Sequence, residues 1–91
     1  MNVTWTSKAV GDLAWLHVFL APVNQRAAAR MLQSLTPVAS RLPDQPRIGE
    51  KLDQYEPREV RRILVGKYEM RYEVRGSSVF ILRLWHTREE R

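Results

Sequence analysis

The side chains of this sequence that could do chemistry are a histidine near its end and a set of arginines around it. His86 follows an apolar run, and a histidine side chain could act as a general acid or base. The alternative is a structural histidine that packs or forms a hydrogen bond where a strand ends. His17 lies off the apolar stripe of the first expected helix, so we interpret it as a packing or surface residue.

Metal and disulfide chemistry are not indicated. The chain has no cysteine, which excludes a disulfide framework and a thiolate metal site. The two histidines are distant in sequence and no carboxylates cluster with them, so we expect neither a metal site nor a cofactor. The first residues lack the pattern of a signal peptide, and the apolar stretches are too short to span a bilayer. We therefore expect a soluble, cytoplasmic protein.

The charge of the chain predicts an anionic partner. The net charge is +5, and residues 46–91 carry eleven Lys or Arg against eight Asp or Glu. A basic surface attracts nucleic acid or an acidic protein segment. The alternative is a merely solvated surface, since a net charge of this size is moderate.

The first half of the chain predicts a strand and a helical hairpin. Val3 and Trp5 alternate with polar residues, as in a short strand. Ser7 is expected to cap a first helix that Pro22 ends. The apolar face of this helix is formed by Ala9, Leu13, Leu16 and Leu20, broadened by Val10, Ala14 and Val18.

A second helix is predicted from about Asn24, and Pro37 inside it is expected to kink or split it. Residues 42–57 contain three prolines and a glycine, which predicts a loop with room for one turn of helix. The apolar stripe of the second helix is Ala28, Met31, Leu32, Leu35, Val38 and Leu42.

The second half predicts three strands, 59–65, 68–75 and 79–85, joined by turns at Gly66 and Gly76. The last is apolar on both faces apart from Arg83, so it should be central. The 91 residues are therefore expected to form a single α+β domain over 1–91. Its layout is an N-terminal strand, an antiparallel helical hairpin and a three-stranded antiparallel meander, all strands in one curved sheet.

Two groups of side chains leave alternatives open. Glu69, Arg71, Glu73 and Arg75 alternate with the apolar residues of their strand. They could form a charged cluster, or a solvated face with weak ion pairs. A second side of the first helix carries two aromatic residues, Trp15 and Phe19. These could face a partner, face a second copy or pack in the core.

Taken together in order and spacing, these motifs resemble the RelE/ParE superfamily of bacterial toxins, over most of the chain. An early strand of that superfamily ends in an aromatic residue, here Trp5. The further matching motifs are Ala-x-x-Asp-Leu at 9–13, Pro-x-x-Gly at 46–49, Arg-Glu at 58–59, Gly-x-Tyr-x-x-x-Tyr at 66–72 and Val-x-Ile-Leu-x-x-x-His at 79–86, followed by Arg88.

The resemblance implies one of two activities. RelE-like members are similar to ribosome-dependent endoribonucleases, which cut mRNA with basic residues on the sheet face and a C-terminal basic or Tyr residue. Such chemistry needs a base near the ribose 2′-OH, an acid at the leaving oxygen and cations for the phosphorane charge. ParE-like members share the fold, lack that constellation and are similar to inhibitors of DNA gyrase.

The sequence departs from the nuclease pattern at two positions. RelE-like enzymes typically have Arg where this chain has Glu69, and an Arg near the position of Thr87. A nuclease reading would have to rely on Arg62, His86 and Arg88. His86 does not discriminate, because both branches carry His there.

We therefore favour a ParE-like gyrase inhibitor without chemistry of its own. The alternatives are a RelE-like mRNA endoribonuclease acting at the ribosome, and an unrelated basic binding domain. Both toxin readings imply a cognate antitoxin, whose acidic, disordered-until-bound segment wraps the toxin in a hetero-oligomer. The expected target-binding residues are Arg58, Arg61, Arg62, Arg83, Trp85, His86 and Arg88, since Arg and Trp are common hot-spot types.

Overall fold

The computed structural model describes residues 1–20, 22 and 24–88. The predicted order of a strand, two helices and a three-stranded meander is confirmed. One short strand, β2, was not predicted, because two residues are too few to show a pattern. In chain order the elements are β1 (Asn2–Trp5), α1 (Ser7–Leu20), α2 (Gln25–Arg41), β2 (Glu50–Lys51), the 3₁₀ turn η1 (Asp53–Tyr55), β3 (Glu59–Val65), β4 (Tyr68–Arg75) and β5 (Ser78–His86).

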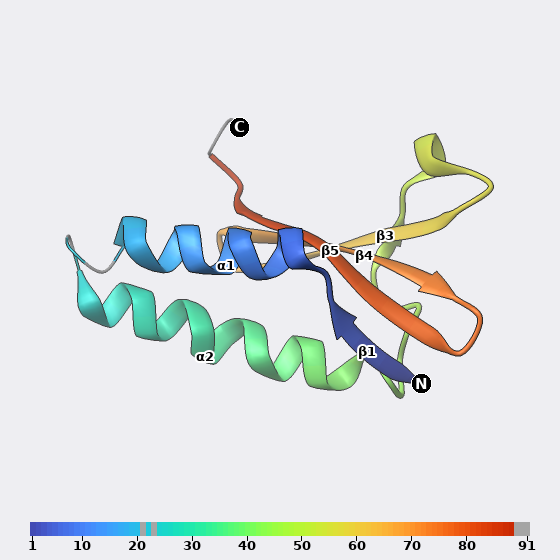
Figure 1. Cartoon of the computed structure of the whole chain (residues 1–91), viewed down its shortest axis with the longest axis horizontal. Coiled ribbons are helices and arrows are strands. Elements are labelled where there is room, and N and C mark those ends of the chain that lie inside the picture. The colour runs from blue at the N-terminus through green and yellow to red at the C-terminus, as the bar shows by residue number, and fades with distance from the viewer. Residues whose placement is uncertain (21, 23, 89–91) are drawn as a thin grey trace.

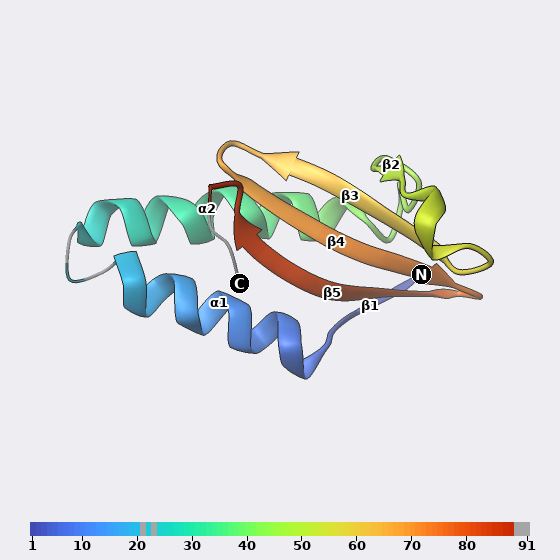
Figure 2. The same ribbon diagram turned by 90° about the horizontal axis from the view of Figure 1, so that it is seen from above.

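The strands form one sheet in the order β1-β5-β4-β3-β2. β1 pairs with β5 in parallel, across the helical crossover, and the other pairs are antiparallel. The prediction that β5 is central is therefore confirmed. Figure 1 shows α1 and α2 side by side as a hairpin, and Figure 2 shows the long curved strands β3, β4 and β5.

Among the described residues, no helix combines the length and the apolar character that a membrane span requires.

The core lies between the hairpin and one face of the sheet. The buried side chains that form the core are Ala9, Leu16, Met31, Leu35, Leu42, Met70, Tyr72, Val74, Val79, Ile81 and Leu84.

Two expectations for α1 are wrong. Its cap is Thr6 and not Ser7: the Thr6 hydroxyl accepts from the backbone N–H of Ala9 at 3.2 Å and donates to the carbonyl oxygen of Ile81 at 2.8 Å. Val10, Ala14 and Val18 do not broaden the buried face, because all three are exposed. One hydroxyl thus caps the helix and ties its start to β5.

Pro37 was expected to kink or split the second helix. It does not split it, because α2 runs unbroken from Gln25 to Arg41. Pro37 is exposed, so its ring and the lost N–H face solvent and not the core. The predicted start is confirmed, since the Asn24 side chain accepts from the N–H of Ala27 at 3.1 Å. The apolar stripe of α2 packs on the sheet as expected.

Three local backbone features shape the sheet: a left-handed glycine, a glycine at a close approach of two strands, and a bulge that shifts the register of β5. Gly66 takes φ 59° in the turn between β3 and β4. A Cβ on Gly49 would lie 2.7 Å from the carbonyl oxygen of Arg62, so only glycine lets β2 reach β3. On β5, Ile81 pairs with Tyr72 but Arg83 pairs with Arg71, which leaves Leu82 as an extra residue.

The edge of β5 beyond β1 is closed by a side chain from α1. β1 ends opposite Ile81, so the next stretch of β5 has no neighbouring strand on that side. Asp12, which is buried, accepts there from the backbone N–H of Leu84 at 2.9 Å. The same carboxylate accepts from Arg83 Nε at 2.7 Å and from Arg83 Nη2 at 3.1 Å. α1 therefore takes the place of the missing strand.

We predict that Asp12→Asn lowers the free energy of unfolding by about 2 kcal/mol. Breaking a buried ion pair costs about 3–5 kcal/mol, and solvent lowers this figure because the Arg83 side chain is 34% exposed. Urea unfolding measures the change. The matched control is Asp44→Asn at an exposed position, expected to change stability by less than about 0.5 kcal/mol. An Asp12→Asn midpoint equal to that of the control would contradict the assigned role of Asp12.

Candidate functional site

The face of the sheet away from the hairpin carries most of the charged and aromatic residues predicted to be functional. Side chains alternate along each strand, so those between the core residues of β4 point to this face. The bulge at Leu82 has a decisive effect here. Without the extra residue, Arg83 and Trp85 would share a face with Ile81, which is in the core. With it, they lie across from Arg71 and Glu69.

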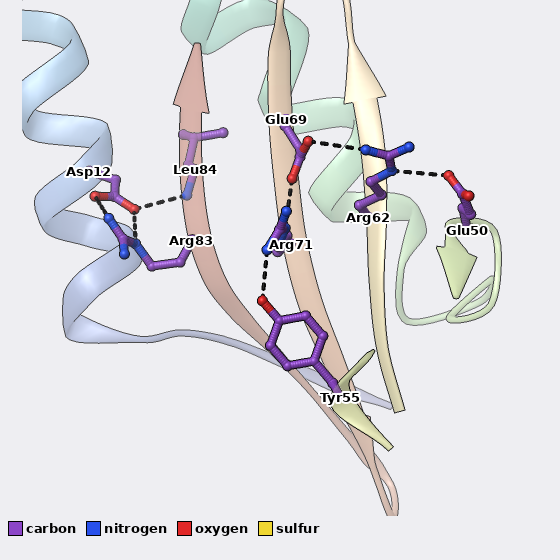
Figure 3. A network of polar contacts seen from close by, with 8 residues as sticks. All are labelled: Asp12, Glu50, Tyr55, Arg62, Glu69, Arg71, Arg83 and Leu84. Carbon is purple, nitrogen blue, oxygen red and sulfur yellow. Dashed lines mark hydrogen bonds and ion pairs between the residues drawn. The ribbon is translucent and has the colours of Figure 1, made fainter. Parts of the chain in front are cut away.

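Glu69 is the centre of an ion-pair chain that crosses this face. It is buried, at 7% exposure. Its carboxylate accepts from Arg71 Nε at 2.6 Å and lies 3.5 Å from Arg62 Nη1. Arg62 also donates to Glu50 on β2 at 3.0 Å, and Arg71 donates to the Tyr55 hydroxyl at 2.7 Å. Figure 3 shows this chain running from β2 across β3 and β4 to η1.

The Trp85 ring contacts two of the guanidinium groups. The central carbon of Arg71 is 4.8 Å from the Trp85 ring centroid, and that of Arg83 is 5.4 Å away. Cations over an indole face are held by the ring quadrupole, which adds about 0.5–1 kcal/mol at accessible sites. The indole therefore joins the Glu69 chain to the Asp12–Arg83 pair.

Glu73 forms a second, separate cluster on the same face. It is only 3% exposed and accepts from Arg58 through two bonds, at 3.2 and 2.9 Å. Arg75 donates to it at 3.1 Å and lies over the Phe80 ring at 5.0 Å. The hydrogen bonds from Arg58 hold the pKa of Glu73 below its usual value despite burial.

The open question of the charged strand face is thus answered in favour of a cluster. The two glutamates are buried and not solvated, because long arginine side chains fold over them. Each arginine on this face that the structure describes already has a carboxylate partner. A phosphate group would have to displace these carboxylates. Within the described part of the chain, no group of three His, Asp or Glu side chains could hold a metal ion.

The residues expected to bind a target fall into three groups. Arg58, Arg62 and Trp85 lie on this face and are partly accessible. Arg61 and Arg83 are largely occupied by the fold: Arg61 pairs with Glu59 and donates to the carbonyl oxygen of Gly49 at 2.8 Å. His86 and Arg88 lie elsewhere, at the end of β5 next to α1.

The structure does not bring the expected nuclease residues together. His86 pairs with Tyr68 across the strands, and their rings meet edge to face at 5.4 Å. Arg62 pairs with Arg71, three residues along β4 from Tyr68, so its side chain points to the opposite face. His86 Nδ1 instead accepts from the backbone N–H of Arg88 at 3.1 Å. This agrees with a structural role for that histidine.

A second accessible feature is the outer side of α1. The rings of Trp15 and Phe19 stack with centroids 5.2 Å apart, and both are exposed. Of the alternatives for this pair, core packing is therefore wrong. Beside them lies a mostly apolar pocket of about 250 Å³, which Leu16, His86 and Arg88 help to line.

Three features of the site were missed by reasoning from the sequence. Tyr55 comes from a connector in which nothing signals contact with the sheet. The burial of Glu69 and Glu73 was not expected, because an alternating charged strand normally faces water. Asp12 had a signal: an acidic residue sits one position before Leu13, inside the apolar stripe of α1, where an unpaired charge would be costly.

Two comparisons with known proteins found a match, one to a family model and one to a solved structure. A family model described as "ParE toxin of type II toxin-antitoxin system, parDE" matches residues 3–91. Among solved structures, a chain of the "Chromosomal ParDE TA system from P. aeruginosa" matches with a TM-score of 0.77 at 21% identity. The match covers 94% of this chain and 95% of that chain, and it shows the same fold. No curated protein matches the sequence.

We predict an acid-dependent loss of stability that Glu73 carries in part. The arginines lower its folded-state pKa below the ordinary 4.5, so its ion pairs contribute fully above pH 4.5 and are lost as the pH falls through the lowered value. Glu73→Gln should be less stable than wild type at pH 7, but its free energy of unfolding should fall less on acidification. Urea unfolding at pH 7 and at stepped pH values below 4.5 measures, for both proteins, the slope of the free energy of unfolding against pH.

The control for this prediction is Glu50→Gln, whose side chain is 66% exposed. It should keep the wild-type slope. Some slope remains in Glu73→Gln as well, because Arg61 and Arg47 lower the pKa of Glu59. Equal slopes for wild type and Glu73→Gln would show that this cluster does not stabilise the fold.

Proposed function

The chain belongs to the ParE toxin family of type II toxin–antitoxin systems, and we propose that it acts by binding and inhibiting DNA gyrase. We propose further that a cognate antitoxin neutralises it in a hetero-oligomer. Gyrase acts on the chromosome, so the proposal implies a cytoplasmic protein. The toxin would work as a binding partner and would not cleave its target.

The observation that carries this proposal is the pairing of arginines with buried glutamates on the face of the sheet away from the hairpin, which we call the helix-free face. A nuclease needs cations that are available for a developing phosphorane charge. Here Arg62 and Arg71 are held by Glu69, and Arg58 and Arg75 by Glu73. A fixed lattice of charges with aromatic rings suits recognition of a protein surface, where Arg and Trp are frequent hot spots.

The runner-up, an mRNA endoribonuclease, lacks such support. It would use Arg62 with His86 and Arg88, yet Arg62 points to the face opposite His86. General acid–base catalysis requires its groups within hydrogen-bond reach of one scissile phosphate. We therefore keep cleavage of RNA as an outcome of the test and not as a second proposal.

Among the expected target-binding residues, we favour Arg58, Arg62, Trp85 and Arg88. These side chains remain accessible while the fold is intact. Arg61 and Arg83 are less suited, because loss of either would disturb the fold before it disturbed a contact. His86 is kept as a contact at the rim of the apolar pocket beside Trp15 and Phe19.

The exposed apolar side of α1 supports the antitoxin part of the proposal. Val18 is 70% exposed and Phe19 61%. A helix that is apolar nearly all round is stable in water only when another element covers it. The matching family model describes the toxin of a toxin–antitoxin system, so we take the antitoxin as the element that covers this side of α1.

We predict that the purified protein inhibits gyrase supercoiling and leaves mRNA intact on translating ribosomes. Arg88→Ala should raise the concentration for half-inhibition about tenfold, equivalent to about 1.4 kcal/mol of binding. Supercoiling is read from plasmid topoisomers on gels, and RNA cleavage from primer extension in a translation reaction.

The control for the gyrase assay is Lys8→Ala, which removes an exposed cation at the start of α1. It should inhibit as wild type does. Ribosome-dependent cleavage that His86→Ala abolishes would replace the gyrase proposal with the nuclease one. Absence of both activities, with no effect on growth when expressed, would reject a toxin.

A further inference from the structure

The free positive charge of the chain does not lie on the helix-free face of the sheet. Ion pairs with carboxylates hold the arginines of that face. Within residues 1–20, 22 and 24–88, the Lys and Arg side chains without an ion pair are Lys8, Arg26, Arg30, Arg41, Lys67 and Arg88. Half of these side chains lie on α2, so the charge available to an anionic partner is concentrated there.

No acidic side chain offsets this charge on the outside of the hairpin. The first 43 residues contain one acidic residue, Asp12, which is buried and paired with Arg83. The next acidic residue in the sequence is Asp44, which follows the end of α2. The two helices therefore present cations to solvent and no carboxylate, and their surface attracts anions.

The arginines of α2 share one exposed side of the helix. Arg26, Arg30 and Arg41 are spaced by four and eleven residues, so at about 100° per residue they lie within about 60° of one another. Gln33 and Pro37 lie between them on the same side, and all five residues are exposed. We call this side of the helix the α2 ridge. Figure 1 shows α2 extended along one side of the molecule.

Lys67 adds a fourth cation beside the α2 ridge. It lies in the turn between β3 and β4 and lines a hollow of about 230 Å³ together with Arg30. This volume is several times the ~30 Å³ that one water molecule occupies in the liquid. The hollow is therefore large enough to admit a phosphate group between the two cations.

We infer that the α2 ridge and Lys67 bind the phosphate backbone of duplex DNA. One phosphate lies between Arg30 and Lys67, and the other arginines of the ridge contact its neighbours. Such contacts need no base recognition, because charge neutralisation supplies most nonspecific binding to DNA. The ridge is about 22 Å long, and a duplex presents about thirteen phosphate charges over that length.

The contact itself needs no gyrase. It rests on the proposed function only in taking the DNA on which gyrase acts as the duplex that the toxin meets in the cell.

The geometry of the α2 ridge selects a stiff duplex over a flexible polyanion. Its arginines are fixed along one helix, and a duplex of this length is straight because its persistence length is about 50 nm. A disordered acidic segment would lose conformational entropy when held along the same line. Single strands are typically bound by aromatic side chains on which bases stack, and α2 contains no aromatic residue.

The shape of the α2 ridge selects DNA over duplex RNA. The major groove of B-form DNA is about 12 Å wide and admits a helix, whereas side chains cannot read the deep, narrow major groove of duplex RNA. The residues beside the arginines are short or polar, as Ala29 and Gln33 are. They let the helix approach the groove while the arginines reach the phosphates on either side.

The test measures the fluorescence anisotropy of a labelled DNA duplex of about 20 base pairs, long enough to cover the ridge, in the presence of the full chain. We expect binding at about 50 mM salt, and a plot of log K against log salt with a slope of about −3.6, as four phosphate contacts require. A single strand and an RNA duplex of the same length should each bind about tenfold more weakly.

A matched pair of variants separates a local contact from the effect of net charge. Arg30→Gln should weaken duplex binding about tenfold at this salt and bring the slope about 0.9 closer to zero, because one phosphate contact is lost. Arg47→Gln removes the same charge from an exposed arginine that is already paired with Glu59. It should keep the wild-type affinity and slope. Circular dichroism confirms that both variants fold.

Four outcomes would overturn the inference. They are no binding at low salt, equal binding of the single strand or the RNA duplex, an equal loss in both variants, and displacement of the duplex by polyglutamate at the same concentration of charges. The last would indicate a site for acidic protein segments instead.

These measurements contain no gyrase, so they fail separately from the proposed function. Binding of the duplex by a protein that leaves supercoiling unaffected would reject gyrase as the target and leave the DNA contact in place. Inhibition of supercoiling without binding of the duplex would do the reverse.

Discussion

The carboxylate of Asp12 is the interaction on which the arrangement of the other elements depends. The sheet needs a neighbour for β5 beyond Ile81, and the chain supplies a helix where another strand would be expected. A helix cannot extend a strand ladder, because its backbone groups are already used. A buried acidic side chain solves this by accepting from Leu84 N–H and from Arg83 at once. α1 is thereby fixed along β5, and α2 follows through the hairpin.

The elements of the fold were largely predictable because most strands obey simple alternation. Residues 59–65 and 68–75 have the predicted bounds, and glycine marks both turns. Simple alternation does not give the correct faces for the residues of β5 that follow its bulge. Leu82 adds one residue to β5 and reverses the faces of all residues after it, and nothing in an apolar run of that length announces the extra residue. The cap of α1 was misplaced by one residue, because Thr6 and Ser7 offer the same hydroxyl chemistry.

The candidate site was predictable in composition but not in electrostatics. Sequence alone indicated a basic face, and it identified Glu69 as a departure from a nuclease. It could not show that Glu69 and Glu73 are buried beneath arginines, because pairing across strands depends on register. Nor could it separate arginines that are held by carboxylates from those that are not. A count of charges treats Arg71 and Arg30 alike, whereas only the structure shows that Arg71 is held by Glu69.

This division of the charges gives the two surfaces different recognition chemistry. On the helix-free face, the arginines are preorganised by their carboxylates, so a partner there pays little entropy to order them but gains little from charge alone. Along α2 the cations are free of such pairs, and long-range attraction of an acidic chain is strongest there. Arg62 belongs to both surfaces, since it lines a hollow of about 580 Å³ between α2 and β3, beside Glu50, and its guanidinium reaches Glu69. A carboxylate that replaced Glu50 beside Arg62 would therefore act on the Glu69 chain through this one side chain.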